Sequence, residues 1–213
     1  MNRIHDARQY APATERNRQP ILQVLQQTLS DRVTVLEIAS GTGEHAVYFA
    51  PRLKPLQWLP SDPDPRLQAS IAAWCDAVPS DNLHPPIPLD ASESVWTVET
   101  HPPDCLREAP IGAIVNINMI HISPWRACLG LMAGANRLLP SGGILYLYGP
   151  YKRGGQHTAA SNESFDASLR WQNPEWGVRD LDDVIDVAAK QDLSFVKTVE
   201  MPANNLSVVF RRN

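Results

Sequence analysis

A chain of 213 residues, 43% hydrophobic and 20% charged, is long enough to bury a core and too apolar for extended disorder. Its formal charge of -4 gives no general attraction to nucleic acid or to an anionic membrane surface. The three cysteines are widely spaced, no stretch reaches the roughly 18 apolar residues of a membrane span, and no signal peptide is apparent, so we expect one cytoplasmic domain, residues 1–213, without a metal site.

The N-terminal half alternates helical and extended patterns. Residues 16–29 have leucine and isoleucine at helical spacing, and Pro20 fits such a helix only in its first turn. Buried strands are predicted at 33–39 and 56–60, and helices at 44–53 and 65–78.

The C-terminal half continues the alternation. It predicts a short third strand at 87–89, a weak helix near 94–100, strands at 111–119 and 142–149, helices at 124–139 and 181–191, and an antiparallel hairpin of 193–201 with 205–212. Residues 151–180 lack clean periodicity. This order indicates an α/β fold with a mainly parallel sheet and helices on both faces.

The glycine loop LEIASGTGEHA (36–46) follows the first predicted strand, where α/β sheets bind ligands. Gly41 and Gly43 allow positive φ and leave room beside the backbone, while Glu37 ends the strand. A third glycine of the dinucleotide fingerprint is absent, because that position is Ala46. A tight turn without a ligand explains the glycine pair equally well.

Two further acids follow the next strands. Asp62 lies about 25 residues after Glu37, near the spacing of a ribose-binding acid, and Asp90 ends the third strand. Each also fits as the cap of a turn or helix. Three acids at successive strand ends suit a nucleoside with a cationic amino-acid end near Glu37.

Several motifs resemble those of class I S-adenosylmethionine-dependent methyltransferases: LEIASGTGEHA, Asp62, LDAS (89–92), NINMIH (116–121) and LLPSGGILYLYGP (138–150). More narrowly, the chain resembles the methyltransferase-like protein 26 family and its bacterial relatives, through ERNRQPIL, NMIHISPW, YGPYKRGGQHT, SNESFDASLR, NPEWGVRD and MPANNLSVVF. The resemblance implies a Rossmann-like fold with a seven-stranded, mainly parallel sheet and an antiparallel last strand.

The same resemblance implies a cofactor site for S-adenosylmethionine, with S-adenosylhomocysteine as product. Its expected residues are Glu37, Ala39, Ser40, Gly41, Gly43 and His45 for the methionine and ribose end, Asp62 for the ribose, Asp90 and Ala91 for the adenine, Asn118 and Met119 beside them, and Tyr10, Arg16 and Asn17 in a lid within residues 1–30. Ala39 replaces the first glycine of many relatives, which is tolerable if its φ is negative.

The reacting methyl group needs little acid–base chemistry, because in-line transfer depends mainly on positioning. Tyr10, Tyr148 and Tyr151 are candidates for an aromatic face against the cation. His121 is a candidate base after the fourth strand, or a structural histidine bonded to a neighbouring carbonyl. Asn118 is expected in the pocket.

Residues 151–180 are longer than a simple connection requires, which indicates a substrate lid. Candidate substrate residues are Tyr151, His157, Asn162, Phe165, Arg170 and Trp176, with Arg153 and Arg170 as partners for a substrate carboxylate and Asn204 and Asn205 at the same rim. A packed surface loop is the alternative.

The favoured function is a methyltransferase for a small-molecule acceptor. A non-catalytic S-adenosylmethionine sensor or scaffold retains the glycine loop without needing the lid or His121. A nicotinamide-dependent oxidoreductase is the third alternative, against which the absent third glycine counts.

Overall fold

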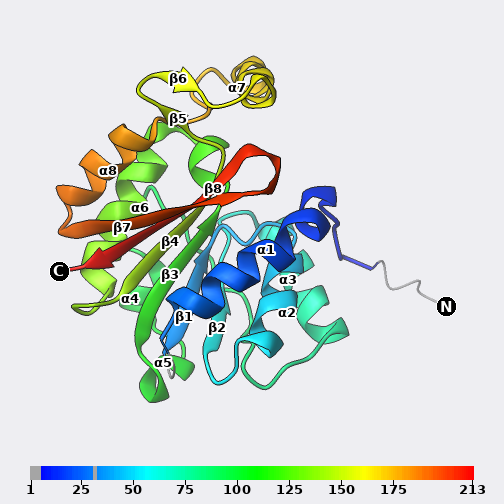
Figure 1. Ribbon diagram of the computed structural model, residues 1–213. Coiled ribbons are helices and arrows are strands. Elements are labelled where there is room, and N and C mark those ends of the chain that lie inside the picture. Colours follow the sequence, from blue (N-terminus) through cyan, green and yellow to red (C-terminus); the bar gives the residue numbers. More distant parts are fainter. Residues whose placement is uncertain (1–5, 31–32) are drawn as a thin grey trace.

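The computed structural model describes residues 6–30 and 33–213 and contains one large mixed sheet with helices on both faces (Figure 1). The strand order is β2-β1-β3-β4-β8-β7. These strands are β1 (Thr34–Ile38), β2 (Gln57–Pro60), β3 (Ile111–Ile117), β4 (Ile144–Gly149), β7 (Leu193–Met201) and β8 (Asn205–Arg212). The first four pair in parallel, and β8 runs antiparallel between β4 and β7, as predicted for the closing hairpin.

The central strands are buried on both faces, which explains their nearly continuous apolar sequences. One face packs against α1 (Pro12–Thr28) and α2 (Glu44–Phe49), with α3 (Pro65–Ala77) beside α2. The other face packs against α4 (Thr97–Thr100), α6 (Trp125–Leu138) and α8 (Leu181–Ala189). Short elements complete this part of the chain: η1 (Ala50–Arg52), α5 (Cys105–Glu108), η2 (Met119–His121) and η3 (Pro202–Asn204).

The main sheet has six strands in the described residues, not the seven that were predicted. The predicted strand at 87–89 lies beside β2 but makes only isolated bridges, such as Ser61 with Ile87. Prolines 85, 86 and 88 have no N–H to donate, so a continuous ladder cannot form there. The Ile87 N–H still donates to the Pro60 carbonyl at 3.1 Å, which keeps this segment in the third-strand position.

The N-terminal helix also differs from the prediction. It begins at Pro12, four residues before the predicted start, and therefore has Pro20 in its interior rather than in its first turn. Pro12 occupies the first turn, where a missing N–H has no cost. Pro20 lacks one helical hydrogen bond, which the buried face of Ile21, Leu22 and Leu25 compensates by packing on the sheet.

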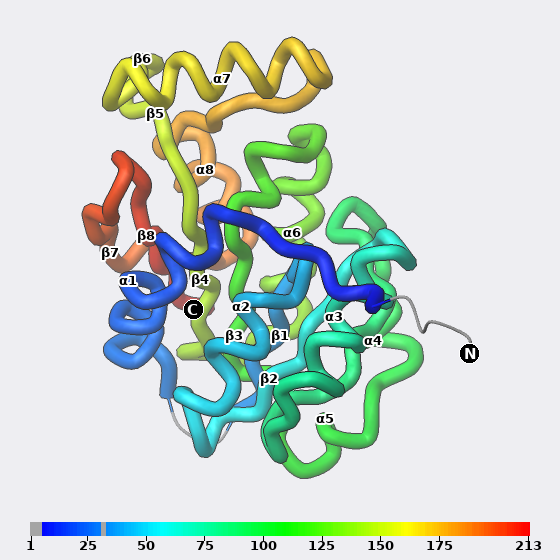
Figure 2. The backbone as a smooth tube through the Cα atoms, turned by 90° about the vertical axis from the view of Figure 1, so that its right-hand side faces the viewer, coloured from blue at the N-terminus to red at the C-terminus, as the bar shows by residue number. Residues whose placement is uncertain are grey.

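Residues 151–180 form a regular structure beyond the carboxyl end of β4 (Figures 1 and 2). A small hairpin of β5 (Lys152–Arg153) and β6 (Gln156–His157) leads into the 13-residue helix α7 (Ala160–Gln172). We call residues 151–180 the lid segment. The sequence did not indicate α7, because its buried face includes the polar residues Asn162 and Asp166 beside Leu169.

The strand order reverses at β1, which pairs with β2 on one side and β3 on the other. The loops after β1, β2 and β3 therefore meet at the carboxyl edge of the sheet, where ligands bind in open α/β sheets. The lid segment and the segment before α1 lie at this same edge (Figure 2).

Candidate functional site

The glycine loop after β1 adopts three left-handed residues at alternate positions: Ala39 (φ 55°), Gly41 (φ 59°) and Gly43 (φ 94°). The condition under which alanine is easily tolerated at position 39, a negative φ, is therefore not met. The Ala39 backbone has the conformation that glycine adopts most easily, so an alanine here carries strain. Position 39 thus requires a backbone conformation that favours glycine, although the residue there is alanine.

The two glycines of this loop serve different purposes. A Cβ on Gly43 would lie 2.8 Å from the Ile71 Cα, so Gly43 lets α2 approach α3. A Cβ on Gly41 would meet no protein atom within 4 Å, so the space beside Gly41 is open. Only Gly41 leaves room for a ligand.

Glu37 lies at the end of β1 with 2% of its surface exposed. Its Oε2 accepts hydrogen bonds from the Trp58 indole N–H and the Ser40 hydroxyl, both at 3.0 Å. Burial raises the pKa of Glu37 to about 7, against the opposing effect of these two hydrogen bonds. A cationic group nearby would favour the charged form, so Glu37 suits an amine partner.

Asp62 and Asp90 follow β2 and the third-strand segment. The Asp62 carboxylate accepts the backbone N–H groups of Gly41 and Asp64, both at 3.0 Å, and burial raises its pKa. Asp90 is exposed, and its Oδ1 accepts both the backbone N–H and the hydroxyl of Ser92. Both acids therefore also stabilise turns, which was the alternative explanation for each.

A cleft of about 210 Å³ lies between these loops and the lid segment. We call it the first cleft. Four of the predicted cofactor residues line it: Ala39, Asp90, Ala91 and Met119. Its other lining residues are Ile38, Pro63, Leu89, Ser92, Ile122, Ser123, Pro124, Arg126, Ala127 and Trp176. Trp176, predicted as a substrate residue, thus lines the same cleft as the predicted adenine residues.

A second, larger cleft of about 540 Å³ shares Ile122 with the first. It is lined by Ala13, Asn17, Asn118, Ile122, Tyr148, Pro150, Ser161, Asn162, Phe165, Ala203, Asn204 and Asn205. These residues come from α1, from the loop after β3, from the end of β4 and the residue after it, from α7, and from η3 and the start of β8. The lid segment therefore contributes residues to both clefts.

The two asparagines at the end of β3 and in the loop after it are placed differently. Asn118 has a left-handed backbone (φ 65°) and lines the second cleft, whereas Asn116 is 1% exposed and donates to the Ile38 carbonyl at 2.9 Å. Asn116 thus holds the end of β1 in place. Ile122, the residue common to both clefts, was not predicted, because an apolar residue after a strand has no distinctive sequence signal.

His121 does not reach either cleft. It is fully buried, its Nδ1 accepts the Arg179 backbone N–H at 3.3 Å, and its carbonyl accepts the N–H of Gly177. Burial, with Arg179 nearby, lowers the pKa of His121 to about 3. These contacts favour the structural alternative over the predicted catalytic base, because the ring ties the β3 loop to the lid segment.

Tyr151 is also misplaced by the prediction. Its side chain is fully buried in the core cluster, and its ring packs edge-on against His121 with centroids 5.0 Å apart. A substrate or a sulfonium group cannot contact a ring that the core encloses. Of the three tyrosines proposed for an aromatic face, only Tyr148 lines a cleft.

The segment before α1 lies over the glycine loop, as Figure 2 shows. The Ala11 N–H donates to Glu44, and the Gln9 N–H donates to Ser70 at 2.8 Å. Tyr10 is 64% exposed and its ring meets Trp74 edge-on. This segment contacts the start of α2 and α3, and its role as a lid stays a prediction.

Two residues of α1 differ in their placement. Asn17 lines the second cleft and its Oδ1 lies 2.8 Å from Nε2 of His45. Burial, with Arg18 nearby, lowers the pKa of His45 to about 3. Arg16 is exposed and lines neither cleft, and its part in an N-terminal lid stays a prediction.

Asp166 organises the lid segment. Its Oδ2 lies 3.2 Å from Lys152 Nζ, 3.4 Å from His157 Nε2 and 3.1 Å from Arg170 Nε, and its Oδ1 accepts the Val178 N–H. Burial raises the pKa of Asp166, but these hydrogen bonds outweigh burial and leave it below its ordinary value. The i, i+4 spacing of Asp166 and Arg170 was the available sequence signal.

The predicted carboxylate partners are occupied by protein carboxylates. Arg170 pairs with Asp166, and Arg153 pairs with Glu200 at 3.0 Å. His157 likewise faces Asp166, so His157 and Arg170 lie outside the second cleft. Of the six predicted substrate residues, Asn162 and Phe165 line it.

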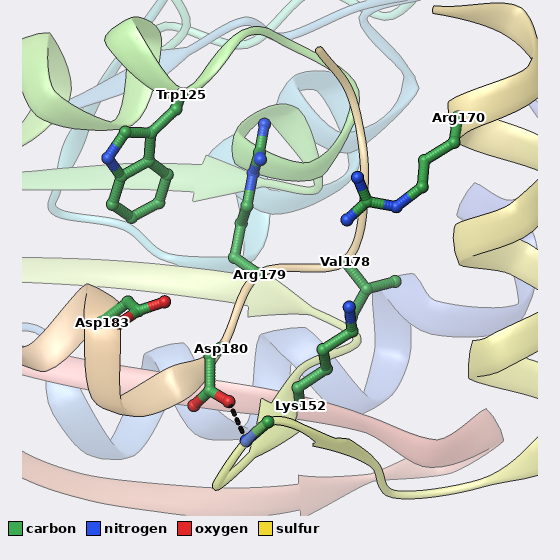
Figure 3. Close-up of a pocket in the computed structure, with 8 residues that line it drawn as sticks. Trp125, Lys152, Arg170, Val178, Arg179, Asp180 and Asp183 are labelled. Atoms are coloured by element: carbon green, nitrogen blue, oxygen red, sulfur yellow. Dashed lines mark hydrogen bonds between the residues drawn. The ribbon is translucent and has the colours of Figure 1, made fainter. Parts of the chain in front are cut away.

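A third hollow, beneath the lid segment, collects charged residues (Figure 3). Arg179 projects between Trp125 and Arg170, and it donates to the carbonyls of Ile120, Ser123 and Glu175. The dashed line in Figure 3 joins Asp180 to the backbone N–H of Gly155. Because Arg179 and Asp180 form hydrogen bonds with protein atoms here, we interpret the hollow as a contact region that holds the lid segment in place.

The sequence of residues 8–212 matches the family described as "Protein of unknown function (DUF938)". The chain belongs to that family. Solved structures resemble this DUF938 chain over most of its length. An O-methyltransferase family 2 protein from Planctomyces limnophilus in complex with apigenin has a TM-score of 0.75 at 16% identity, covering 92% of this chain and 56% of that one.

Two further structures are similar to the DUF938 chain. Mitomycin 7-O-methyltransferase MmcR has a TM-score of 0.73 at 14% identity, covering 92% of this chain and 54% of its own. CalO1, a methyltransferase in calicheamicin biosynthesis with bound SAH, has a TM-score of 0.68 at 12% identity, covering 92% and 54%. The chain thus spans little more than half their length, and it has the Rossmann-like fold of class I methyltransferases.

None of the helices in the described ranges 6–30 and 33–213 is both long and apolar enough to cross a membrane.

Proposed function

We propose that this protein is an S-adenosylmethionine-dependent methyltransferase that acts on a small-molecule acceptor. The observation that carries the proposal is the pair of adjoining clefts at the carboxyl edge of the sheet, which share Ile122. A methyl donor and its acceptor need two sites in contact, because the transfer is in-line and requires the reacting atoms to be close and aligned.

The residues at the first cleft fit the nucleoside end of the cofactor. Ala39, Leu89, Ala91 and Met119 provide apolar walls for a flat base, and Asp90 provides carboxylate oxygens at the rim. The open space beside Gly41 leaves room for the ribose and methionine portion. Glu37, whose pKa burial raises to about 7, would hold the amino group.

S-adenosylmethionine, when bound, supplies a methyl group on a sulfonium. This chain's residues would position the acceptor against it: Asn118 and Tyr148 from one side of the second cleft, and Phe165 from α7 on the other. Burial raises the pKa of Tyr148, so its hydroxyl is protonated at neutral pH and would be available to donate a hydrogen bond to the acceptor. The lid segment would exclude water from both clefts.

The fold-level comparisons support a small acceptor, since the similar structures include a complex with apigenin and an enzyme named for mitomycin. The motifs shared with the methyltransferase-like protein 26 family support a closer kinship with that family. Three free cysteines are consistent with a reducing compartment, and we place the protein in the cytoplasm as a single domain over residues 1–213.

Calorimetry tests the cofactor assignment. We expect S-adenosylmethionine and S-adenosylhomocysteine to bind and NADH to give no heat, and binding of NADH alone would favour an oxidoreductase. Ala91→Leu, which fills the first cleft, should abolish binding of both nucleosides. Ala203→Leu, in the second cleft, is the matched control and should leave binding of S-adenosylhomocysteine unchanged.

Turnover separates an enzyme from a binding module. A labelled-methyl assay with cell extract as the source of acceptor should transfer label to a small molecule. Nucleoside binding without transfer to any component would instead indicate a sensor.

A further inference from the structure

The second cleft is lined by neutral side chains throughout. Its polar groups are amides and hydroxyls, including Asn162, Asn204 and Asn205, and its apolar groups include Ile122 and Phe165. In the lid segment, Lys152 and Arg170 pair with Asp166, and Arg153 pairs with Glu200 of β7, all outside this cleft. A carboxylate or phosphate on the acceptor would therefore be desolvated without a cationic partner, which is costly.

Three of the five asparagines that line this cleft use side-chain N–H groups within the protein. Asn162 donates to the Thr158 hydroxyl and the Asn204 carbonyl, and Asn205 donates to the carbonyls of Pro202 and Ala203. Asn204 donates to the Ser161 hydroxyl at 3.1 Å. Their side-chain carbonyl oxygens remain to accept hydrogen bonds, so this rim suits a ligand that carries N–H or O–H donors.

The cleft offers no base for removing a proton from the acceptor. Among the described residues that line it, Tyr148 is the titratable one, and burial raises its pKa above its ordinary value. His45 is separated from the cleft by Asn17, and His121 lies in the core behind Asn118 and Gly149. Burial lowers the pKa of each histidine to about 3.

Without a base, the acceptor atom must carry a nucleophilic electron pair without help from the protein. A neutral aryl amine has one, but its methylation would leave a cation in a cleft lined by neutral side chains. An alcohol is not ionised at neutral pH, and an ammonium would need to lose a proton and would face the sulfonium charge in a cleft without a carboxylate. A thiol is the exception, since a few per cent is thiolate at pH 7 and the thiolate is intrinsically nucleophilic. The sulfonium charge would also attract a thiolate.

Resting on the proposed methyltransferase function, we propose that the acceptor is a small thiol with an uncharged body that carries N–H or O–H donors. The thiol loses its proton to solvent, and the thiolate sulfur forms a bond to the methyl carbon. The bond between that carbon and the sulfonium sulfur breaks, and its electron pair stays on that sulfur. The products are a methyl thioether and neutral S-adenosylhomocysteine.

Three probes of matched shape test the acceptor atom: 4-acetamidothiophenol, 4-acetamidophenol and 4-acetamidoaniline. We expect kcat/KM for the thiol to exceed that for the phenol and the amine by at least about tenfold at pH 7. The thiol is appreciably ionised without a base, the phenol is not, and methylation of the neutral amine leaves a cation without a partner. Equal or faster methylation of the phenol or the amine would overturn the proposal. So would faster methylation of 4-mercaptobenzoate, whose carboxylate has no partner in the cleft.

The pH dependence gives a second, independent readout. With 4-acetamidothiophenol and the less acidic 4-acetamidobenzyl thiol, the rise of kcat/KM with pH should move with the pKa of the thiol. A rise at the same pH for both thiols would indicate a base on the protein and would contradict the proposal.

The rim oxygens are tested with Asn204→Gly, which removes the side chain and keeps the left-handed backbone of that residue. It should lower kcat/KM for 4-acetamidothiophenol severalfold more than that for unsubstituted thiophenol. Equal losses for both would overturn the recognition part of the proposal. If S-adenosylmethionine binds but no thiol is methylated, the thiol assignment fails alone, whereas absence of nucleoside binding refutes the proposed function itself.

Discussion

Glu37 is buried, and burial destabilises the charged form of its carboxyl group. It lies at the end of a strand buried on both faces, and its carboxylate accepts two hydrogen bonds, from Trp58 and Ser40. No salt bridge to Glu37 forms among residues 6–30 and 33–213. Burial raises its pKa to about 7. The free protein therefore holds Glu37 partly protonated at neutral pH, and a bound amine would convert it to the charged form.

This shift makes stability depend on pH. A carboxyl whose pKa is higher in the folded state binds more protons there, so the free energy of unfolding falls as pH rises from about 4.5 to about 7 and then levels. Glu37→Gln should remove this loss and stabilise the ligand-free protein above pH 7 by roughly 2–3 kcal/mol. Urea unfolding at pH 5, 6, 7 and 8 measures both effects.

The exposed glutamate Glu108 supplies the matched control, since Glu108→Gln should leave the pH dependence as it is in the parent. A parent protein whose stability rises between pH 5 and 7 would show that Glu37 is charged in the folded state. The Glu37→Gln variant should at the same time bind S-adenosylmethionine more weakly.

The two loop glycines should separate stability from binding. Gly43→Ala puts a methyl group 2.8 Å from the Ile71 Cα at φ 94°, so we expect a loss of about 2–4 kcal/mol in the free energy of unfolding. Gly41→Ala meets open space and should cost only about 1 kcal/mol for its positive φ, while weakening nucleoside binding at least about tenfold. Urea unfolding and calorimetry give the two quantities. Comparable losses of stability in both variants would contradict this assignment.

Individual residues could be predicted only where topology determines their place. Glu37, Asp62 and Asp90 follow successive strands, and parallel strands bring such positions to one edge. The burial of His121 and Tyr151 has no such signal, because it depends on how the lid segment packs on the β3 loop. The positive φ of Ala39 could not be predicted from the sequence either, since alanine rarely adopts a positive φ.

At the scale of elements, the strands were predictable and the lid segment was not. β1, β3 and β4 are continuous apolar runs, which is what burial on both faces selects. The prediction of a regular strand at 87–89 was wrong because the prolines there interrupt the hydrogen-bond ladder. The helix α7 packs through Asn162 and Asp166, so its periodicity in apolar residues alone is weak.

The lid segment should depend on the charge of Asp166. Asp166→Asn keeps an acceptor for the Val178 N–H but leaves Lys152 and Arg170 without their carboxylate, so the lid should open more easily by about 1–3 kcal/mol. Hydrogen exchange of the α7 amides should then be roughly tenfold faster or more. The exchange of β3 and β4 should not change.

The charge of Asp166 also makes the stability of the lid segment depend on pH. Because the pKa of Asp166 is lowered in the folded state, its stabilisation is present above about 3.9 and is lost as pH falls through the lower folded value. Glu163→Gln, on the exposed face of the same helix, is the control and should exchange like the parent. Parent-like exchange in Asp166→Asn would show that packing alone holds the lid.

At the scale of the whole molecule, two clefts meet at Ile122, and the lid segment contributes Trp176 to one and Phe165 to the other. Within the lid segment, one substitution should therefore change the affinity for the cofactor and another should change the turnover of the acceptor. Trp176→Ala should weaken binding of S-adenosylhomocysteine severalfold, because it removes a wall of the first cleft. Phe165→Ala should leave that affinity within about twofold and lower transfer of labelled methyl to acceptors in cell extract by about tenfold or more.

Trp171, which is 88% exposed on α7, provides the matched aromatic control. Trp171→Ala removes a tryptophan from the same segment without touching either cleft, so binding and transfer should both equal those of the parent. If Trp176→Ala binds S-adenosylhomocysteine as tightly as the parent does, the nucleoside does not occupy the first cleft. If Phe165→Ala instead weakens that binding, the two clefts act as one site and their division between donor and acceptor is wrong.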